Sequence, residues 1–190
     1  RWTFLLDLID GLPRTSRTTS AILNDPDPHR VEAIARAARV SETEVWVMAP
    51  MISTPTEAAE FADLAHAAGL ERVGVMVEIP SAALQAEEIL SEVDFVSIGT
   101  NDLAQYAMAT DRQAPGLGGL QDPWQPAVLR LLGMVGHAGR RAGKPVGVCG
   151  EAAADPALAA VLVGLGVTSL SMALRALEPV RRALARVTVE

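Results

Sequence analysis

The sequence has little cysteine, few aromatic residues, no excess of basic residues and no long apolar run. One cysteine among 190 residues excludes an intrachain disulfide and fits a reducing compartment better than a secreted setting. No apolar stretch approaches the ~20 residues that cross a bilayer, and Asp7 and Asp10 stand where a signal peptide would be basic. We therefore expect a cytoplasmic protein without membrane insertion.

Charge and length narrow the class further. The net charge is -7, with 16 Lys and Arg against 23 Asp and Glu, so the chain lacks a basic footprint for a phosphate backbone and no nucleic-acid partner is expected. A hydrophobic fraction of 49% is enough for one well-buried domain. The chain begins at Arg1, within a pattern already in progress, which indicates a fragment.

Short apolar segments alternate with helical stretches, as in parallel sheets that helices cover on both faces. The predicted strands are residues 45–48, 73–77, 95–98, 146–149 and 169–172, with a weaker candidate at 2–6. This alternation predicts right-handed β-α-β units in an α/β fold, either a doubly wound sheet or part of a (β/α)8 TIM barrel, which in full takes about 250 residues. We assign residues 1–30 to an N-terminal segment of uncertain assignment and residues 31–190 to the main domain.

Several helices are marked by their end signals. Residues 54–57 combine an N-cap threonine, a proline at the first helical position and a capping-box glutamate, and Gly69 ends that helix. A second helix is predicted over residues 82–90. Asp155 and Pro156 begin another helix in the same way.

Reactive side chains stand at or just after the ends of predicted strands, where both candidate folds place their chemistry. Glu78 and Asp102 are two carboxylates at neighbouring strand ends, which suits Mg²⁺ because this ion takes one or two carboxylates and completes its octahedron with water and substrate oxygens. Cys149 ends a third strand, and Arg112 offers a guanidinium for phosphate or carboxylate. The Gly/Pro-rich residues 113–125 are predicted to form an active-site loop.

Each residue alone also has a simpler explanation. Glu78 could be a surface acid, Arg112 a solvated ion-pair residue and Cys149 an inert buried side chain. A nucleophilic role for Cys149 lacks a histidine base at the other predicted strand ends, so proton transfer is the more economical role. The three histidines stand far apart without ligand spacing, and no zinc or iron site is expected.

Four motifs together make a family recognisable. In chain order they are GVMVEIPSAAL, DFVSIGTNDLAQY, DR and GVCGEAAADP, preceded by VMAPMIST and followed by SLSM. Across residues 44–187 the chain resembles the C-terminal, phosphoenolpyruvate-binding domain of enzyme I of the bacterial sugar phosphotransferase system, the phosphoenolpyruvate-protein phosphotransferase. The resemblance implies a (β/α)8 barrel, here partial at its N-terminus, that binds phosphoenolpyruvate with Mg²⁺ and forms a homodimer.

The resemblance also implies a role for each matching residue. Glu78 and Asp102 fall on the metal ligands, Asn101, Asp102 and Arg112 on substrate-binding positions, and Cys149 on the proton donor that converts the enolate to pyruvate. In the family the phosphoryl group passes to a histidine of a separate domain and then to a small histidine-containing carrier protein. The chain itself would therefore hold only part of the reaction.

Other assignments stay open at the level of sequence. The segment RTSRTTSAIL, which contains Arg14 and Arg17, resembles either the family's phosphohistidine loop with arginine in place of histidine or its early phosphate-binding arginines. Pyruvate phosphate dikinase and phosphoenolpyruvate synthase share the barrel, the metal and the cysteine. A truncated domain that only binds ligand or dimerises, without catalysis, is the remaining alternative.

Overall fold

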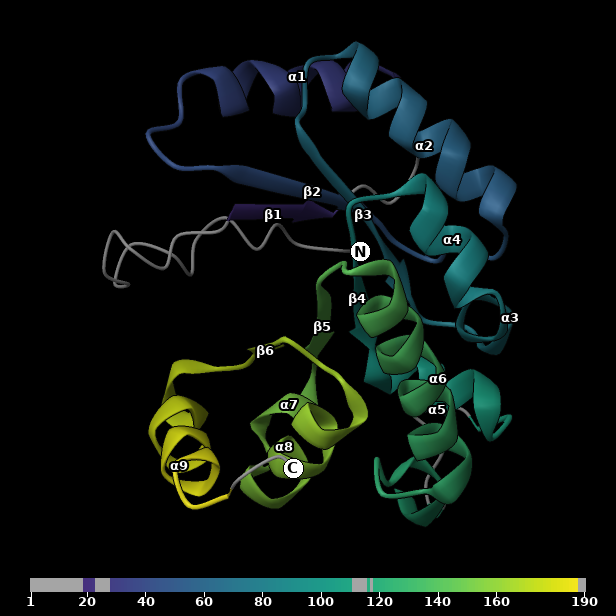
Figure 1. The fold of residues 1–190 in the computed structure, drawn as a ribbon, viewed down its shortest axis with the longest axis vertical. Helices are drawn as coiled ribbons and strands as arrows, with labels where there is room; N and C mark the ends of the chain where they lie inside the picture. The colour runs from purple at the N-terminus through teal and green to yellow at the C-terminus, as the bar shows by residue number, and fades with distance from the viewer. Residues whose placement is uncertain (1–18, 23–27, 111–115, 117, 188–190) are drawn as a thin grey trace.

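The computed structural model describes residues 19–22, 28–110, 116 and 118–187. Within them, six strands form one sheet in the order β1-β2-β3-β4-β5-β6, and every neighbouring pair is parallel (Figure 1). The strands are β1 (Thr19–Ile22), β2 (Val45–Ala49), β3 (Arg72–Val77), β4 (Phe95–Gly99), β5 (Val146–Cys149) and β6 (Ser169–Ser171). The helices are α1 (Pro28–Arg39), α2 (Pro55–Ala67), α3 (Pro80–Leu84), α4 (Ala86–Glu92), α5 (Thr100–Ala107), the 3₁₀ turn η3 (Gly118–Gln121), α6 (Pro126–Ala142), α7 (Glu151–Ala154), α8 (Pro156–Leu165) and α9 (Leu174–Leu184).

The strand order decides between the two folds that the sequence allowed. A doubly wound sheet reverses its order at a switch point, whereas the strands of a (β/α)8 barrel follow one another around the axis. Here the spatial order equals the chain order across all described strands. The prediction of an α/β fold of the barrel type is confirmed, and the described strands form an arc of such a barrel.

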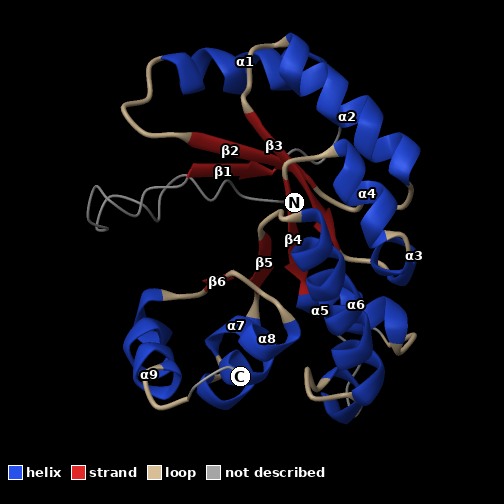
Figure 2. Cartoon of the chain, viewed as in Figure 1, coloured by secondary structure: helices blue, strands red, loops and turns tan. Residues whose placement is uncertain are grey.

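The two faces of the sheet carry different side chains. Branched aliphatic residues point outward and are fully buried beneath the helices, as Val75, Val96 and Val148 illustrate. The helices lie around the outer side of the curved sheet (Figure 2). The inner face instead holds larger or softer groups, with the Trp46 and Phe95 rings 4.8 Å apart at their centroids. These side chains fill the inner side of the described sheet below the carboxyl ends of the strands, where the predicted site residues stand.

Local end signals place the helices that follow the strands. The Thr54 side chain accepts a hydrogen bond from the Glu57 N–H, and the Glu57 carboxylate accepts from the Thr54 N–H, so the predicted capping box is present at α2. Asp155 caps α8 through hydrogen bonds from Ala157 and Leu158 N–H. Both predicted helix starts are confirmed.

The prediction of one helix over residues 82–90 is wrong in one respect, because the helix is interrupted at Gln85. This residue has φ -109° and ψ 27°, and it separates α3 from α4. Its side-chain amide donates to the Ser53 carbonyl, and the Ser81 hydroxyl donates to the same carbonyl at 2.6 Å. These contacts tie α3 to the β2–α2 loop, while α4 packs against α2 and α6.

The sequence did not reveal strand β1. It lies within the 1–30 segment and pairs with β2 in parallel, from Thr19 opposite Val45 to Ile22 opposite Met48. The weaker candidate strand at residues 2–6 lies outside the described residues. The core sheet thus begins earlier than residue 31.

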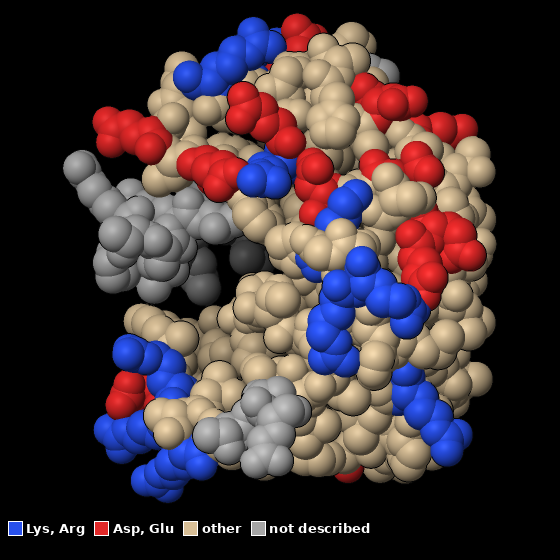
Figure 3. All heavy atoms as spheres, in the orientation of Figure 1, with Lys and Arg blue, Asp and Glu red and all other residues tan. Residues whose placement is uncertain are grey.

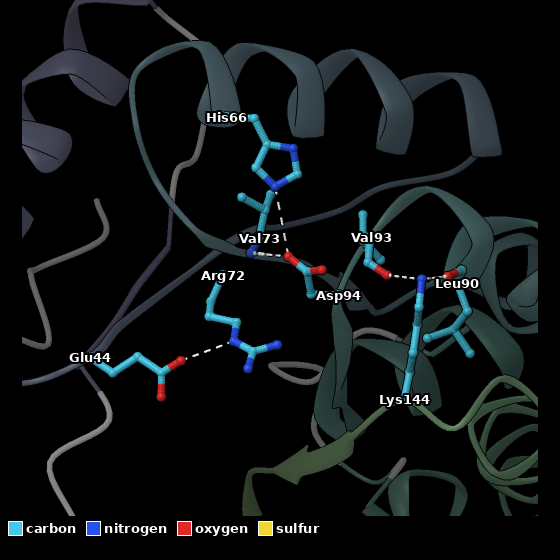
Figure 4. A network of polar contacts seen from close by, with 8 residues as sticks. All are labelled: Glu44, His66, Arg72, Val73, Leu90, Val93, Asp94 and Lys144. Carbon is cyan, nitrogen blue, oxygen red and sulfur yellow. Dashed lines mark hydrogen bonds and ion pairs between the residues drawn. The ribbon is translucent and has the colours of Figure 1, made fainter.

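Polar contacts join the starts of the strands, at the end of the barrel opposite the predicted chemistry (Figure 4). Arg72 donates to the Glu44 carboxylate at 2.9 Å, and Asp94 accepts from the Val73 N–H at 2.9 Å. The Lys144 ammonium donates to the Leu90 and Val93 carbonyls, where α4 ends. In barrels of this type that end serves stability rather than catalysis.

Charged side chains are spread over the surface, with basic ones gathered on α9 at the lower left of Figure 3. Arg175, Arg181 and Arg182 on this helix are all exposed. In the part of the chain that the structure describes, no helix combines the length and apolarity needed to span a membrane.

Candidate active site

Glu78 follows the last residue of β3 and is only 5% exposed. Its Oε2 accepts a hydrogen bond from the Met51 N–H at 2.9 Å. Met51 has φ 55°, a left-handed backbone that is strained for a non-glycine residue and that clusters at functional sites. A Cβ on Gly99 would lie 2.6 Å from Glu78 Oε1, so the absent side chain leaves room for the carboxylate.

Asp102 and Asn101 stand in the first turn of α5, directly after β4 ends at Gly99. This turn packs against the one that follows β5. The Thr100 hydroxyl donates to the Cys149 carbonyl at 3.0 Å, and a Cβ on Gly150 would lie 3.1 Å from Asn101 Oδ1. The two turns therefore hold Asn101 and Asp102 beside the end of β5.

Cys149 ends β5 opposite Gly99 of β4, and its Sγ lies 3.5 Å from the Ile98 carbonyl oxygen. Burial raises the pKa of this thiol, the Ser97 hydroxyl opposes that change, and the negative charges of Glu78 and Asp102 raise the pKa further. The thiol thus stays protonated at neutral pH. Gly99 lies against Glu78, stands opposite Cys149 in the sheet and precedes Asp102 by three residues, so the structure brings together the three residues that the sequence singled out.

Ser97 is a site residue that the sequence reasoning missed. It is 8% exposed, lies opposite Gly147 in the parallel register and shares the inner face with Phe95 and Gly99. One signal was available, because residues two apart in a strand face the same way and a lone serine among inward positions of an apolar strand points to the interior.

Part of the predicted loop lies at the same rim. Residues Gly118, Gly119, Gln121, Asp122 and Pro123 face Thr100, Asn101 and Glu151 across a recess of about 470 Å³. A larger groove, of about 900 Å³, lies on the outer side between α3, α4 and α6, and none of the predicted site residues lines it. Arg112, Arg14 and Arg17 lie outside the described residues.

The donor groups fit a hard cation better than a soft one. Among the described residues, no group of three or more His, Cys, Asp or Glu side chains is placed to hold a metal. Glu78 and Asp102 are a pair of carboxylates, and Gly99 places no side-chain atom against Glu78 Oε1. This pair could hold Mg²⁺ with water and substrate oxygens as the other ligands. His66 and His137 are exposed on α2 and α6, away from the site.

Two solved structures with a similar fold are described as a citrate lyase and as an HpcH/HpaI aldolase/citrate lyase family protein. A citrate lyase from Burkholderia xenovorans superposes with a TM-score of 0.66 and 20% identity, over 86% of this chain and 56% of that chain. An HpcH/HpaI aldolase/citrate lyase family protein from Burkholderia cenocepacia gives a TM-score of 0.53 and 21% identity, over 88% of this chain and 93% of that chain. These similarities concern the fold alone, and they agree with a parallel α/β barrel.

The family follows from closer relatives. Residues 16–189 match the PEP-binding domain of PEP-utilising enzymes, and the chain belongs to this family. A phosphoenolpyruvate-protein phosphotransferase from Streptomyces coelicolor is 52% identical over 91% of this chain and 32% of its own length. One from Geobacillus stearothermophilus is 47% identical over 67% of this chain and 22% of its own length. A phosphoenolpyruvate synthase from Pyrococcus furiosus is 37% identical over 86% of this chain and 21% of its own length. The chain thus spans a third or less of these relatives.

Proposed function

We propose that this chain is the phosphoenolpyruvate-binding part of an enzyme I of the phosphotransferase system, which takes part in sugar transport. In this proposal Glu78 and Asp102 hold Mg²⁺, and Asn101, Asp102 and Arg112 bind the substrate. The observation that carries the proposal is that two carboxylates and one thiol lie at the carboxyl ends of three neighbouring strands, β3, β4 and β5. The 52% identity to a phosphoenolpyruvate-protein phosphotransferase over most of the chain supports the choice of enzyme.

The proposed reaction needs a proton donor close to the methylene carbon of the substrate. Loss of the phosphoryl group from phosphoenolpyruvate leaves the enolate of pyruvate, and its methylene carbon must gain a proton. Bound Mg²⁺ would supply positive charge next to the enolate oxygen. Cys149 would donate its Sγ proton to the methylene carbon, and its raised pKa favours the protonated form that this step requires.

The phosphoryl acceptor would be a histidine of a separate domain, which passes the group to a histidine-containing carrier protein. The matched region makes up a third or less of these relatives, which leaves room for such a domain in them. A homodimer and a cytoplasmic location belong to the same proposal, and the single cysteine is in keeping with the second. The proposal also includes phosphate binding by Arg14 or Arg17.

A phosphoenolpyruvate synthase or pyruvate phosphate dikinase is the second candidate. The synthase from Pyrococcus furiosus covers 86% of this chain at 37% identity, a lower identity than the phosphotransferase but a similar coverage. The two candidates differ in the acceptor chemistry and not in the barrel. Phosphorylation of a supplied enzyme I histidine domain supports the first, and ATP-dependent formation of phosphoenolpyruvate would replace it with the second.

Binding is the direct test. Calorimetry of the full chain with phosphoenolpyruvate and Mg²⁺ should show binding that Glu78→Gln and Asp102→Asn each reduce by at least about tenfold, as expected for loss of a metal-ligand carboxylate. Glu60→Gln, on the exposed face of α2, is the matched control and should bind normally. Equal binding by wild type and both site variants would reject these ligands.

Proton transfer is tested separately. Exchange of the pyruvate methyl protons in deuterated water, followed by nuclear magnetic resonance, should disappear in Cys149→Ala while phosphoenolpyruvate still binds. Unchanged exchange in this variant would reject Cys149 as the donor. Binding without exchange in the wild type would instead favour a domain that binds ligand but has no catalytic role.

A further inference from the structure

A side-chain hydrogen bond between Trp124 and Asp155 joins the segment that faces Asn101 to the rest of the barrel. The indole Nε1 of Trp124 donates to Asp155 Oδ2 at 3.1 Å. The other carboxylate oxygen, Oδ1, accepts from Ala157 N–H at 2.8 Å and from Leu158 N–H at 3.3 Å. Asp155 therefore has two functions at once, since one oxygen caps α8 and the other holds the indole.

Asp155 is a firm point of attachment. Burial raises the pKa of its carboxyl, but hydrogen bonds from Ala157 N–H, the Trp124 indole and Leu158 N–H together outweigh burial and lower it. The carboxylate is thus charged at neutral pH, and hydrogen bonds to a charged acceptor are stronger than neutral ones. Asp155 also stands only six residues after Cys149, at the other end of the short helix α7.

Hydrogen bonds within residues 118–125 join these residues to one another. The contact made by Trp124 therefore positions the whole segment and not a single residue. The Trp124 N–H donates to Asp122 Oδ1 at 2.9 Å, and the Gln125 side-chain amide donates to the Gly119 carbonyl at 2.8 Å. The Gln125 N–H also donates to the Asp122 carbonyl at 3.0 Å. A shift of the indole would therefore carry the η3 turn with it.

This unit forms one wall of the recess whose opposite wall includes Thr100, Asn101 and Glu151. Trp124 is 40% exposed, so burial of its aromatic surface explains its presence less well than its directed indole N–H does. The tryptophan side chain donates only through its indole nitrogen, and this nitrogen is bonded to Asp155.

We propose that Trp124 is a positioning residue. Through its hydrogen bond to Asp155 it fixes residues 118–125 against the turn that follows α7, and so sets the width of the recess beside Asn101. The consequence for phosphoenolpyruvate binding rests on the proposed function. The attachment itself does not, and it can be measured without ligand.

Two substitutions remove the hydrogen bond while they retain its surroundings. Trp124→Phe keeps an aromatic ring and loses the N–H. Asp155→Asn keeps Oδ1 as the cap of α8 but replaces Oδ2 with an amide nitrogen, which cannot accept from the indole. Asp155→Ala loses both the indole contact and the cap of α8. It measures the contribution of the cap to stability, because only this variant should lower the melting temperature markedly.

Hydrogen–deuterium exchange of the ligand-free full chain is the first measurement. Residues 118–125 should exchange about 5- to 10-fold faster in Trp124→Phe and in Asp155→Asn than in the wild type, as expected for loss of one partly exposed side-chain hydrogen bond. The double variant should exchange no faster than either single variant, since both remove the same bond. Wild-type exchange in the single variants, or additive effects in the double variant, would overturn the proposal.

Affinity for phosphoenolpyruvate with Mg²⁺ is the second measurement. Both single variants should bind about 3- to 10-fold more weakly at unchanged melting temperature, again without additivity. Wild-type affinity in both variants would overturn the effect on the recess. Failure of the wild type to bind would reject the proposed function alone, and the exchange rates of residues 118–125 would then decide the role of Trp124.

Discussion

Gly99 and Glu78 fit against each other without space for a further carbon atom. A Cβ on Gly99 would lie 2.6 Å from Glu78 Oε1 and 2.8 Å from Glu78 Cγ. The backbone at Gly99 has φ -88° and ψ 88°, so an alanine would meet the carboxylate rather than a forbidden backbone conformation. Glycine at this position therefore leaves the space that the Glu78 side chain occupies.

Gly99→Ala should displace the Glu78 carboxylate and leave the fold largely intact. We expect affinity for phosphoenolpyruvate with Mg²⁺ to fall by at least about tenfold, because misplacement of a ligand by about 1 Å is costly in a preorganised site. Calorimetry measures the affinity, and thermal unfolding controls for a change in stability. Normal affinity in a folded Gly99→Ala protein would contradict the role given to this close contact.

The pKa of Cys149 gives a prediction without any substrate. Because burial and the charges of Glu78 and Asp102 raise this pKa, the thiolate forms only at a higher pH than for an ordinary cysteine. Alkylation by iodoacetamide should therefore be slow at pH 8 and should accelerate as the pH rises. Glu78→Gln or Asp102→Asn should speed it by about 2- to 10-fold at pH 8, since each removes a negative charge near the sulfur.

Ser97→Ala is the matched control for that experiment. The Ser97 hydroxyl lowers the thiol pKa, so its removal should slow alkylation and not speed it. Mass spectrometry reads the result directly because Cys149 is the one cysteine in the sequence. If all three variants changed the rate in the same direction, altered access to the sulfur would explain the data better than electrostatics.

Lys144 should matter for stability and not for binding. Its ammonium donates to the Leu90 and Val93 carbonyls, which the end of α4 leaves without helical partners (Figure 4). Lys144→Met should lower the free energy of unfolding by about 1–3 kcal/mol, measured by urea denaturation. Arg141→Met, which removes an exposed pair with Glu87, should cost at most about 1 kcal/mol. Equal losses in the two variants would contradict the special role of Lys144.

The features that could be predicted from sequence are those whose cause is local. Thr54 with Glu57, and Asp155 with Pro156, mark helix starts because capping depends on residues within one turn. The apolar runs predicted the strands for the related reason that strands covered by helices are apolar along their whole length. The strand-end positions of Glu78, Asp102 and Cys149 then followed from parallel topology.

The features that were missed depend on contacts between distant segments. The break at Gln85 follows from hydrogen bonds to Ser53, 32 residues away, which no helix signal contains. Strand β1 is short and is defined by its pairing with β2. The Met51 N–H reaches Glu78 across 27 residues, and the Trp124–Asp155 contact spans 31 residues. Such contacts become visible only when the barrel brings successive loops to one rim.

Two glycines in α6 should respond oppositely to the same substitution. A Cβ on Gly136 would overlap the Leu165 carbonyl at the end of α8, and a backbone atom cannot easily move away. A Cβ on Gly133 would instead lie 3.4 Å from Leu165 Cδ2, the tip of a flexible side chain. Gly136→Ala should thus lower the free energy of unfolding by about 1–3 kcal/mol. Gly133→Ala should be neutral or stabilising by up to about 1 kcal/mol, because alanine favours the helix. Urea denaturation of both variants checks the pair, and equal destabilisation would mean that α6 and α8 do not pack as closely as the Gly136 contact requires.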